Sequence, residues 1–132
     1  MGILAETDSG SALNITTEQA VGEFTAPYPM MLGAQLRLSG LNAAAANLTI
    51  GLRLKSAAGA MIADYVWTQP KRTATDTVFG ADAEPIYVAA GEKVEWRVLS
   101  SNASDTSVTW SAAWLNRWDI DNLATKQSRP QL

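Results

Sequence analysis

The sequence predicts an all-β domain in which two antiparallel sheets pack face to face. A jelly-roll arrangement is the leading prediction, and an immunoglobulin-like sandwich is the alternative. Apolar and polar residues alternate with a period of two in several segments of the 132-residue chain. These segments recur about every 8–12 residues, with turn residues between them. No intervening segment has the length and amphipathic pattern of a helix, which argues against a parallel α/β sheet.

The clearest strands are expected at residues 30–39, 47–55 and 60–68. The turn sequence Ser-Ala-Ala-Gly at residues 56–59 separates the last two and predicts a hairpin. Residues 40–46 contain four alanines but are too short for a stable isolated helix, so a loop is expected there. The face of the third strand that is expected to pack into the core carries Met61, Ala63, Tyr65 and Trp67.

Residues 86–115, IYVAAGEKVEWRVLSSNASDTSVTWSAAWL, give the strongest signal. They read as two alternating strands joined by the polar turn at residues 100–105, which we interpret as a hairpin. The register directs one side of each strand into the core and leaves a bland face of serine, threonine and charged residues outside. The residues expected to point inward are Val94, Trp96, Val98, Val108, Trp110, Ala112 and Trp114.

The chain is expected to form one domain with two extensions. Residues 1–11 are small and polar and are interpreted as an N-terminal arm, and residues 12–115 form the sandwich. Less regular strands are expected within residues 12–26, 76–79 and 85–88. Residues 116–132 lack alternation and are interpreted as a polar C-terminal tail.

Composition narrows the possible functions. The chain has no histidine and no cysteine, so it lacks the commonest general base, the commonest metal ligand and any thiolate site. Ten basic and thirteen acidic residues give a net charge of −3 without a basic patch, so no nucleic-acid partner is expected. The chain lacks a recognisable signal peptide and any long apolar run, so no membrane association is expected.

Loose carboxylate groups raise calcium binding or two-carboxylate catalysis as alternatives. Neither group matches a calcium-loop pattern, and nothing in the sequence indicates a pocket around them. We therefore expect no enzyme activity, no metal site and no cofactor. The carboxylates in question are Asp76, Asp82, Glu84, Asp119 and Asp121.

The tail provides the best candidates for contact with a partner. Trp118, Ile120 and Leu123 are isolated apolar residues in a polar segment, and Arg117 precedes them directly. Buried aromatic and arginine side chains dominate the energetics of many protein interfaces. We therefore predict that these four residues contact a partner protein.

Two phrases of the sequence resemble small β-sandwich proteins of tailed bacteriophages. GEFTAPYPMMLGAQLRLSGL resembles the first strands of such domains, and PIYVAAGEKVEWRVLSSNASDTSVTWSAAWL resembles their closing strands. The resemblance covers about residues 20–115 and is one of overall style, so it transfers no binding residue. It implies a virion location, in a capsid decoration or cement protein, with the major capsid protein and further copies of the chain as partners in a dimer or trimer.

The alternative function is a carbohydrate-binding or receptor-binding module at a phage tail tip or fibre. Aromatic side chains on a protein surface can stack against sugar rings. The residues considered for this role are Trp118, Tyr28 and Tyr87.

Overall fold

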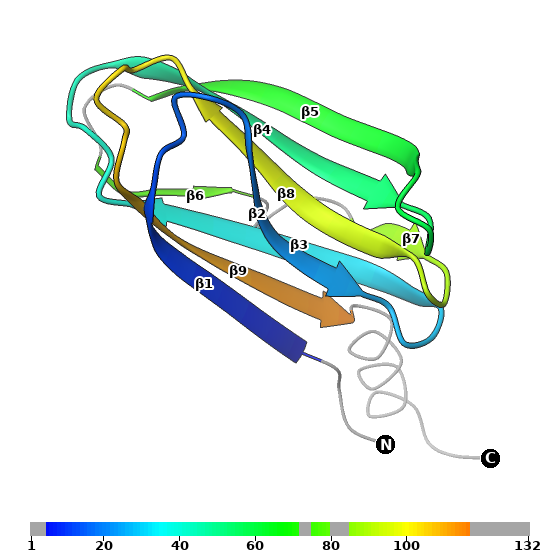
Figure 1. The fold of residues 1–132 in the computed structure, drawn as a ribbon. Helices are drawn as coiled ribbons and strands as arrows, with labels where there is room; N and C mark the ends of the chain where they lie inside the picture. Colours follow the sequence, from blue (N-terminus) through cyan, green and yellow to red (C-terminus); the bar gives the residue numbers. More distant parts are fainter. Residues whose placement is uncertain (1–4, 72–74, 80–84, 117–132) are drawn as a thin grey trace, which may run out of the picture.

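The computed structural model describes residues 5–71, 75–79 and 85–116. The described residues contain nine strands and no helix, and the strands form two antiparallel sheets that face each other (Figure 1). The strands are β1 (Ala5–Leu13), β2 (Gln19–Thr25), β3 (Met30–Ser39), β4 (Ala46–Lys55), β5 (Met61–Lys71), β6 (Thr77–Phe79), β7 (Ile86–Val88), β8 (Lys93–Ser100) and β9 (Val108–Asn116).

The strand order confirms the jelly-roll prediction. One sheet has the order β1-β9-β3-β6, with β7 also paired to β3, and the other has the order β2-β8-β4-β5. The chain crosses from sheet to sheet between most successive strands, and β4–β5 is a hairpin within one sheet. Two sheets with this interleaved strand order define the jelly roll, and β7 is an additional short strand in one of them. The loop expected at residues 40–46 is also present, up to the start of β4 at Ala46.

The interpretation of residues 86–115 as a hairpin is wrong. Strand β8 pairs with β2 and β4, whereas β9 pairs with β1 and β3 in the opposite sheet. The polar turn between β8 and β9 therefore crosses from one sheet to the other. The alternating pattern is the same in both arrangements, because it determines which face of a strand is buried and not which strand lies beside it.

The aromatic core lies between these two strands. Trp96 of β8 stacks on Trp114 of β9 across the sandwich, with ring centroids 6.4 Å apart, and Phe24 of β2 lies 6.0 Å from Trp114. Both tryptophans are buried, and Trp110 packs against the same core while remaining partly exposed. The predicted inward orientation of these three tryptophans is confirmed. Offset stacking of this kind adds about 0.5–1.5 kcal/mol beyond the burial of apolar area.

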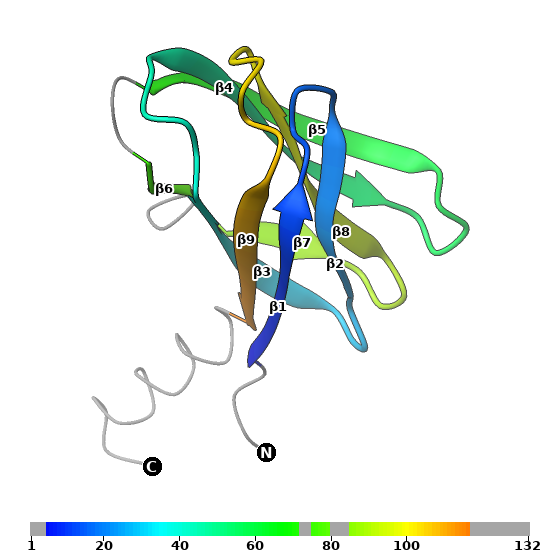
Figure 2. The ribbon, with the colours of Figure 1, turned by 60° about the vertical axis from the view of Figure 1, so that its left-hand side comes forward.

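Strand β1 begins within the segment that the sequence indicated as an arm. Residues 5–13 pair antiparallel with β9, from Ala5 opposite Leu115 to Leu13 opposite Val108. The composition of β1 is polar because it lies at the edge of its sheet, where apolar alternation is not required (Figure 2). The start of β1 and the end of β9 are side by side, so residues 1–4 and 117–132 join the described fold at the same end.

A buried polar network fixes the loops at the opposite end. Asp105, in the β8–β9 turn, accepts hydrogen bonds from the Ser100 hydroxyl at 2.5 Å and from the Asn42 backbone N–H at 2.7 Å. The Lys71 ammonium donates to the carbonyl oxygens of Asn42 and Ala44. Asp105 and Lys71 are both buried, and hydrogen bonding offsets the cost of removing them from water.

Candidate interaction surface at the open edge of the sandwich

The four tail residues predicted to contact a partner are Arg117, Trp118, Ile120 and Leu123. All four lie outside the described residues, so their role stays a prediction. Of the aromatic residues considered for sugar binding, Tyr28 packs partly buried against the core, while Tyr87 is 54% exposed on β7. The side chain of Trp67 also lies outside the described part of the molecule.

The candidate interaction surface in the described residues is β5, the last strand on one side of the β2-β8-β4-β5 sheet. This strand is 11 residues long, and it pairs with β4 from Lys71 opposite Ala46 to Met61 opposite Lys55. Its surface is unusually apolar for a sheet edge. The large exposed apolar side chains are Met61 (61% exposed), Ile62 (50%), Tyr65 (45%) and Val66 (56%).

Both faces of β5 contribute to this surface. Tyr65 lies opposite Leu52 of β4 and Ala63 lies opposite Leu54, so these β5 residues share the core-facing side of the sheet. The prediction of a shared face is therefore correct for Ala63 and Tyr65. Met61 lies opposite Lys55, beyond a register shift, and the expectation that Met61 and Tyr65 are buried is wrong.

The reason is that the two sheets are unequal on this side. Among the described residues, the strands that face β5 across the sandwich are β6 and β7, and each has three residues. A hollow of about 300 Å³ opens between the two sheet edges. It is lined by Leu48, Gln69, Pro70 and Lys71 from one sheet and by Asp76, Thr77 and Val78 from the other side.

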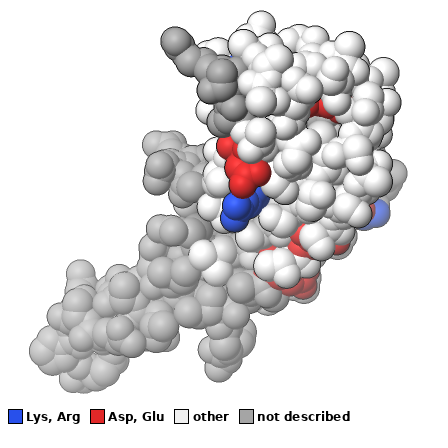
Figure 3. Space-filling view, turned by 90° about the vertical axis from the view of Figure 1, so that its left-hand side faces the viewer, with Lys and Arg blue, Asp and Glu red and all other residues white. Residues whose placement is uncertain are grey.

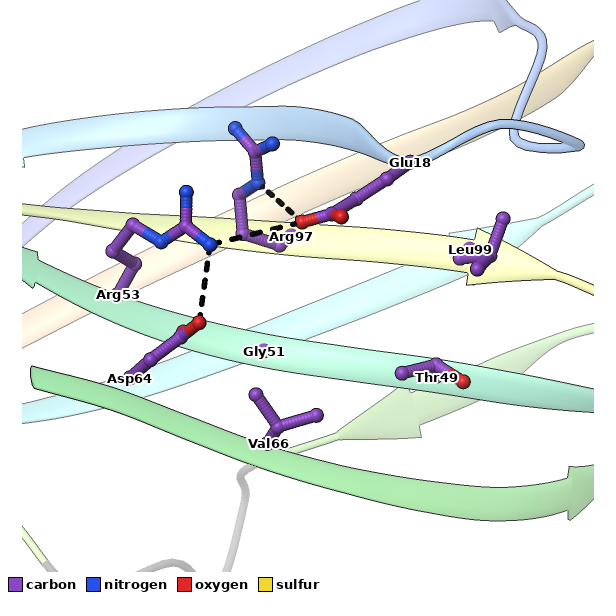
Figure 4. A pocket seen from close by; sticks show the side chains of 8 residues that line it. All are labelled: Glu18, Thr49, Gly51, Arg53, Asp64, Val66, Arg97 and Leu99. Atoms are coloured by element: carbon purple, nitrogen blue, oxygen red, sulfur yellow. Dashed lines mark hydrogen bonds and ion pairs between the residues drawn. The ribbon is translucent and has the colours of Figure 1, made fainter.

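The outer face of the same sheet holds a network of ion pairs (Figure 4). The Arg97 Nε donates to Glu18 Oε1 at 2.9 Å, and Arg53 lies 3.0 Å from Asp64 and 3.9 Å from Glu18. These side chains surround a shallow hollow of about 140 Å³, and Val66 of β5 lies at its border. The hydrogen bond to Asp64 raises the pKa of the Arg53 guanidinium above its ordinary value.

The network continues toward the other end of the strands. The Lys55 ammonium lies 2.8 Å from Glu23 and 3.3 Å from Glu95, and Glu95 also lies 3.7 Å from Arg97. The hydrogen bond to Glu23, supported by the charge of Glu95, raises the pKa of Lys55. Carboxylates and cations alternate across this face, so their charges balance locally. Such a face can pack against a neighbour without presenting a strong field of either sign.

Sequence reasoning identified neither the open edge nor the ion-pair network. Most of the network joins side chains from different strands, such as Arg53 with Asp64, 11 residues apart, and Arg97 with Glu18, 79 residues apart. The outward orientation of Glu95 and Arg97 followed from the alternating pattern, but their partners follow from the strand order. The available signal for β5 was its composition, because large apolar residues occupy both of its faces.

The loop end of the molecule is weakly charged. In the view toward this end, most of the visible described surface carries neither basic nor acidic side chains (Figure 3). The loop after β3 contributes exposed Ala43, Ala44 and Ala45. A shallow hollow next to it is lined by Ala45, Ala46, Asn47, Pro70, Lys71 and Ser101.

The candidate calcium ligands are not brought together in the described residues. Asp76 pairs with Arg37 at 3.2 Å, while Asp82, Glu84, Asp119 and Asp121 lie outside that part of the chain. No group of three His, Cys, Asp or Glu side chains in the described residues is arranged to hold a metal ion. The described part of the molecule also contains no helix with the length and apolar character needed to cross a membrane.

Comparison with known proteins gives structural matches. No protein-family model matches the sequence, and no curated protein does either. A chain in the structure of infectious bursal disease virus, Gx strain, matches 87% of this chain with a TM-score of 0.54 and 11% identity. A chain of the T13 viral particle of the same virus matches 84% with a TM-score of 0.51 and 10% identity. This chain spans about a third of the length of each, 33% and 31%. The molecule therefore has the fold of a β-sandwich domain found in virus particles.

Proposed function

We propose that this chain is a non-enzymatic structural protein of a virus particle. The observation that carries the proposal is the match of 87% of the chain to part of a virus-particle protein. The described surface supports the same view, because its most unusual feature is an exposed apolar edge. Large exposed apolar patches on soluble proteins commonly mark interaction sites.

Within this class, we propose a capsid decoration or cement protein of a tailed phage, located in the virion. It bridges neighbouring copies of the major capsid protein and associates with copies of itself. A bridging protein needs at least two contact regions. The flanking segments join the fold at one end of the β1-β9-β3-β6 sheet, whereas β5 borders the other sheet. This separation allows one region to bind the shell while the other binds a neighbour.

In this mechanism the tail contacts the shell. Trp118, Ile120 and Leu123 bury their apolar side chains at the junction between capsid subunits, and Arg117 pairs with an acidic group there. Weak individual contacts are sufficient, because repeated binding sites on a lattice increase the overall affinity.

The test uses shells of the virus prepared without this protein. The full chain is expected to bind them and to raise their melting temperature, and a chain truncated after Asn116 is expected to do neither. A chain carrying Trp118→Phe serves as the matched control and is expected to retain most of the binding. Failure of the full chain to bind the shells would overturn the decoration role. Full binding by the truncated chain would remove the tail from the mechanism.

A second candidate function is a carbohydrate-binding or receptor-binding module of a phage tail tip or fibre. It is favoured by the exposed ring of Tyr87, which can stack on a sugar. Titration with host polysaccharide is expected to change the tyrosine resonances of the wild type but not of Tyr87→Ala. No change across a panel of host glycans would exclude this function for Tyr87.

A further inference from the structure

The four strands that end the two sheets differ in how they are protected against further pairing. Natural edge strands are usually short, bulged or charged, since an exposed regular edge offers free backbone groups to another strand. Strand β6 has three residues. Strand β1 carries Glu6 and Asp8 and has an irregular register before Leu13, and β2 has an irregular register at Gly22 and carries Glu23. These three edges each have a recognisable protection.

Strand β5 has little such protection. Its pairing with β4 is regular from Lys71 to Ala63, and its register shift lies only at the Met61 end, so the strand offers a long edge to a partner. Between Met61 and Gln69 its single charged residue is Asp64, which is bound to Arg53 of β4 at 3.0 Å. A strongly charged partner strand therefore finds few charges on β5 with which to form ion pairs. A neutral strand with the same composition meets no electrostatic repulsion.

We propose that β5 pairs antiparallel with β5 of a second copy of the chain, about a two-fold axis at Tyr65. This pairing would join two four-stranded sheets into one continuous sheet of eight strands. In this register Ile62 lies opposite Thr68, Asp64 opposite Val66, and Met61 opposite Gln69. The paired segment ends before Pro70, which has no N–H to donate to a ladder.

The neighbouring registers are less favourable. An axis at Asp64 places the two Asp64 carboxylates directly opposite each other, and like charges in that position destabilise a strand pair. An axis at Val66 places Pro70 opposite Ile62 and so includes the proline in the ladder. The Tyr65 register avoids both problems and brings two half-exposed tyrosine rings together at the centre. Aromatic cross-strand pairs contribute roughly 0.2–1 kcal/mol relative to alanine pairs.

This inference names a partner and a surface, and it does not rest on the proposed function. The test is sedimentation equilibrium of the purified full chain. The wild type is expected to form a dimer, and Tyr65→Lys is expected to weaken association at least tenfold, because it places two ammonium groups opposite each other. The matched control is Tyr87→Lys, which changes a similarly exposed tyrosine on the other sheet and is expected to leave association unchanged. A wild type that stays monomeric at 100 times the concentration used for shell binding would overturn the proposal.

Cross-linking tests the register separately. The chain contains no cysteine, so each introduced thiol is unique. In the proposed register the two copies of position 65 lie opposite each other, with Cβ atoms about 4.5–5.5 Å apart. The two copies of position 62 lie six residues apart along the ladder, or about 20 Å. Mild oxidation with diamide is therefore expected to link Tyr65→Cys into a covalent dimer and to leave Ile62→Cys monomeric on a denaturing gel.

The double variant Ile62→Cys with Thr68→Cys is expected to link efficiently, since these two positions face each other across the axis. Equal linking of Ile62→Cys and Tyr65→Cys would overturn the register, and linking of Val66→Cys in place of Tyr65→Cys would move the axis by one residue. Shell binding and dimer formation are measured on different partners. Loss of one with retention of the other would therefore distinguish failure of the proposed function from failure of this inference.

Discussion

The two outer strands β1 and β5 both leave one edge unpaired, but they differ in their side chains and in how they are held. Each lies at the end of its sheet and pairs on one side with a single neighbour, β9 or β4. The described side chains of β1 are mostly polar, and the chain just after the strand is hydrogen-bonded to the β8–β9 turn. The exposed side chains of β5 include four large apolar residues, and the C-terminal end of the strand borders an open hollow. The comparison indicates that β1 is held by contacts within one chain, whereas the edge of β5 is suited to pairing with a second chain.

The attachment of β1 explains how a polar strand can be held firmly. Two residues beyond its end, Ile15 is buried and donates its N–H to the Asp105 carbonyl at 3.0 Å, while its carbonyl accepts the Ser100 N–H at 2.8 Å. Within the strand, Gly10 lies directly under the indole of Trp110. Strand β1 is therefore fixed by backbone bonds and by shape, with little need for apolar side chains of its own.

The largest effect is expected where the β8–β9 turn, which carries this attachment, loses its own side-chain support. Asp105→Ala leaves the buried Ser100 hydroxyl and the Asn42 N–H without their acceptor. Each unsatisfied buried donor costs roughly 1–3 kcal/mol, so we expect the free energy of unfolding to fall by about 3 kcal/mol. Urea denaturation measures this change. The matched control is Asp8→Ala on β1, an exposed position where about 0.5 kcal/mol or less is expected. Equal effects at the two positions would show that the turn does not anchor this side.

A smaller effect is expected from the contact between β1 and the core. A Cβ atom at Gly10 would lie 2.5 Å from the Trp110 Nε1, closer than side chains pack. Gly10→Val therefore has to displace the indole, and overpacking of this kind costs about 1–3 kcal/mol. We expect about 2 kcal/mol by thermal or urea unfolding, together with a change in tryptophan fluorescence. Ser9→Val makes a comparable addition at the neighbouring exposed residue. A loss of stability at Ser9 as large as that at Gly10 would contradict the proposed steric cause.

The same contrast explains how much the sequence could predict. Alternation in residues 30–39 and 47–55 correctly identified β3 and β4, and it correctly directed Trp96 and Trp114 into the core. It could not identify pairing partners, so β8 and β9 were interpreted as one hairpin although they lie in opposite sheets. The inward face of a strand is a local property of the sequence. The neighbour of a strand depends on the path of the whole chain.

The candidate surface was missed for the same reason. Tyr65 lies on the face that alternation predicts, but burial also requires a covering strand in the opposite sheet. That strand is short on this side, and its length is encoded far away in residues 77–79 and 86–88. The polar strand β1 was read as an arm because edge strands need no apolar face. Sequence patterns thus predict central strands more reliably than edge strands.

The comparison can also be tested by making β1 resemble β5. Replacing Glu6 and Asp8 with valine removes two exposed carboxylates from the β1 edge. We expect roughly tenfold stronger self-association, or about 1.4 kcal/mol, because like charges no longer oppose pairing of two β1 strands. The change is made in a Tyr65→Lys background, which suppresses pairing through β5, and is followed by sedimentation equilibrium. Thr7→Val with Ser9→Val adds the same valines but keeps both charges. Equal association by that control would show that apolar content matters and edge charge does not.

The smallest effect is expected from the ion pairs behind β5. Because its pKa is raised in the folded protein, Lys55 stabilises the fold while it is charged. This contribution is fully present below the unfolded pKa of about 10.4 and disappears as the pH rises through the higher folded value. We expect Lys55→Met to cost about 0.5 kcal/mol at pH 8, near the middle of the range for ion pairs at a protein surface. The difference from wild type should vanish by strongly alkaline pH. Lys93→Met, at a position with no ion pair among the described residues, controls for the titration of other groups. A difference for Lys55→Met that stays constant with pH would mean that the stem of Lys55 stabilises this face by packing, and that its charge does not.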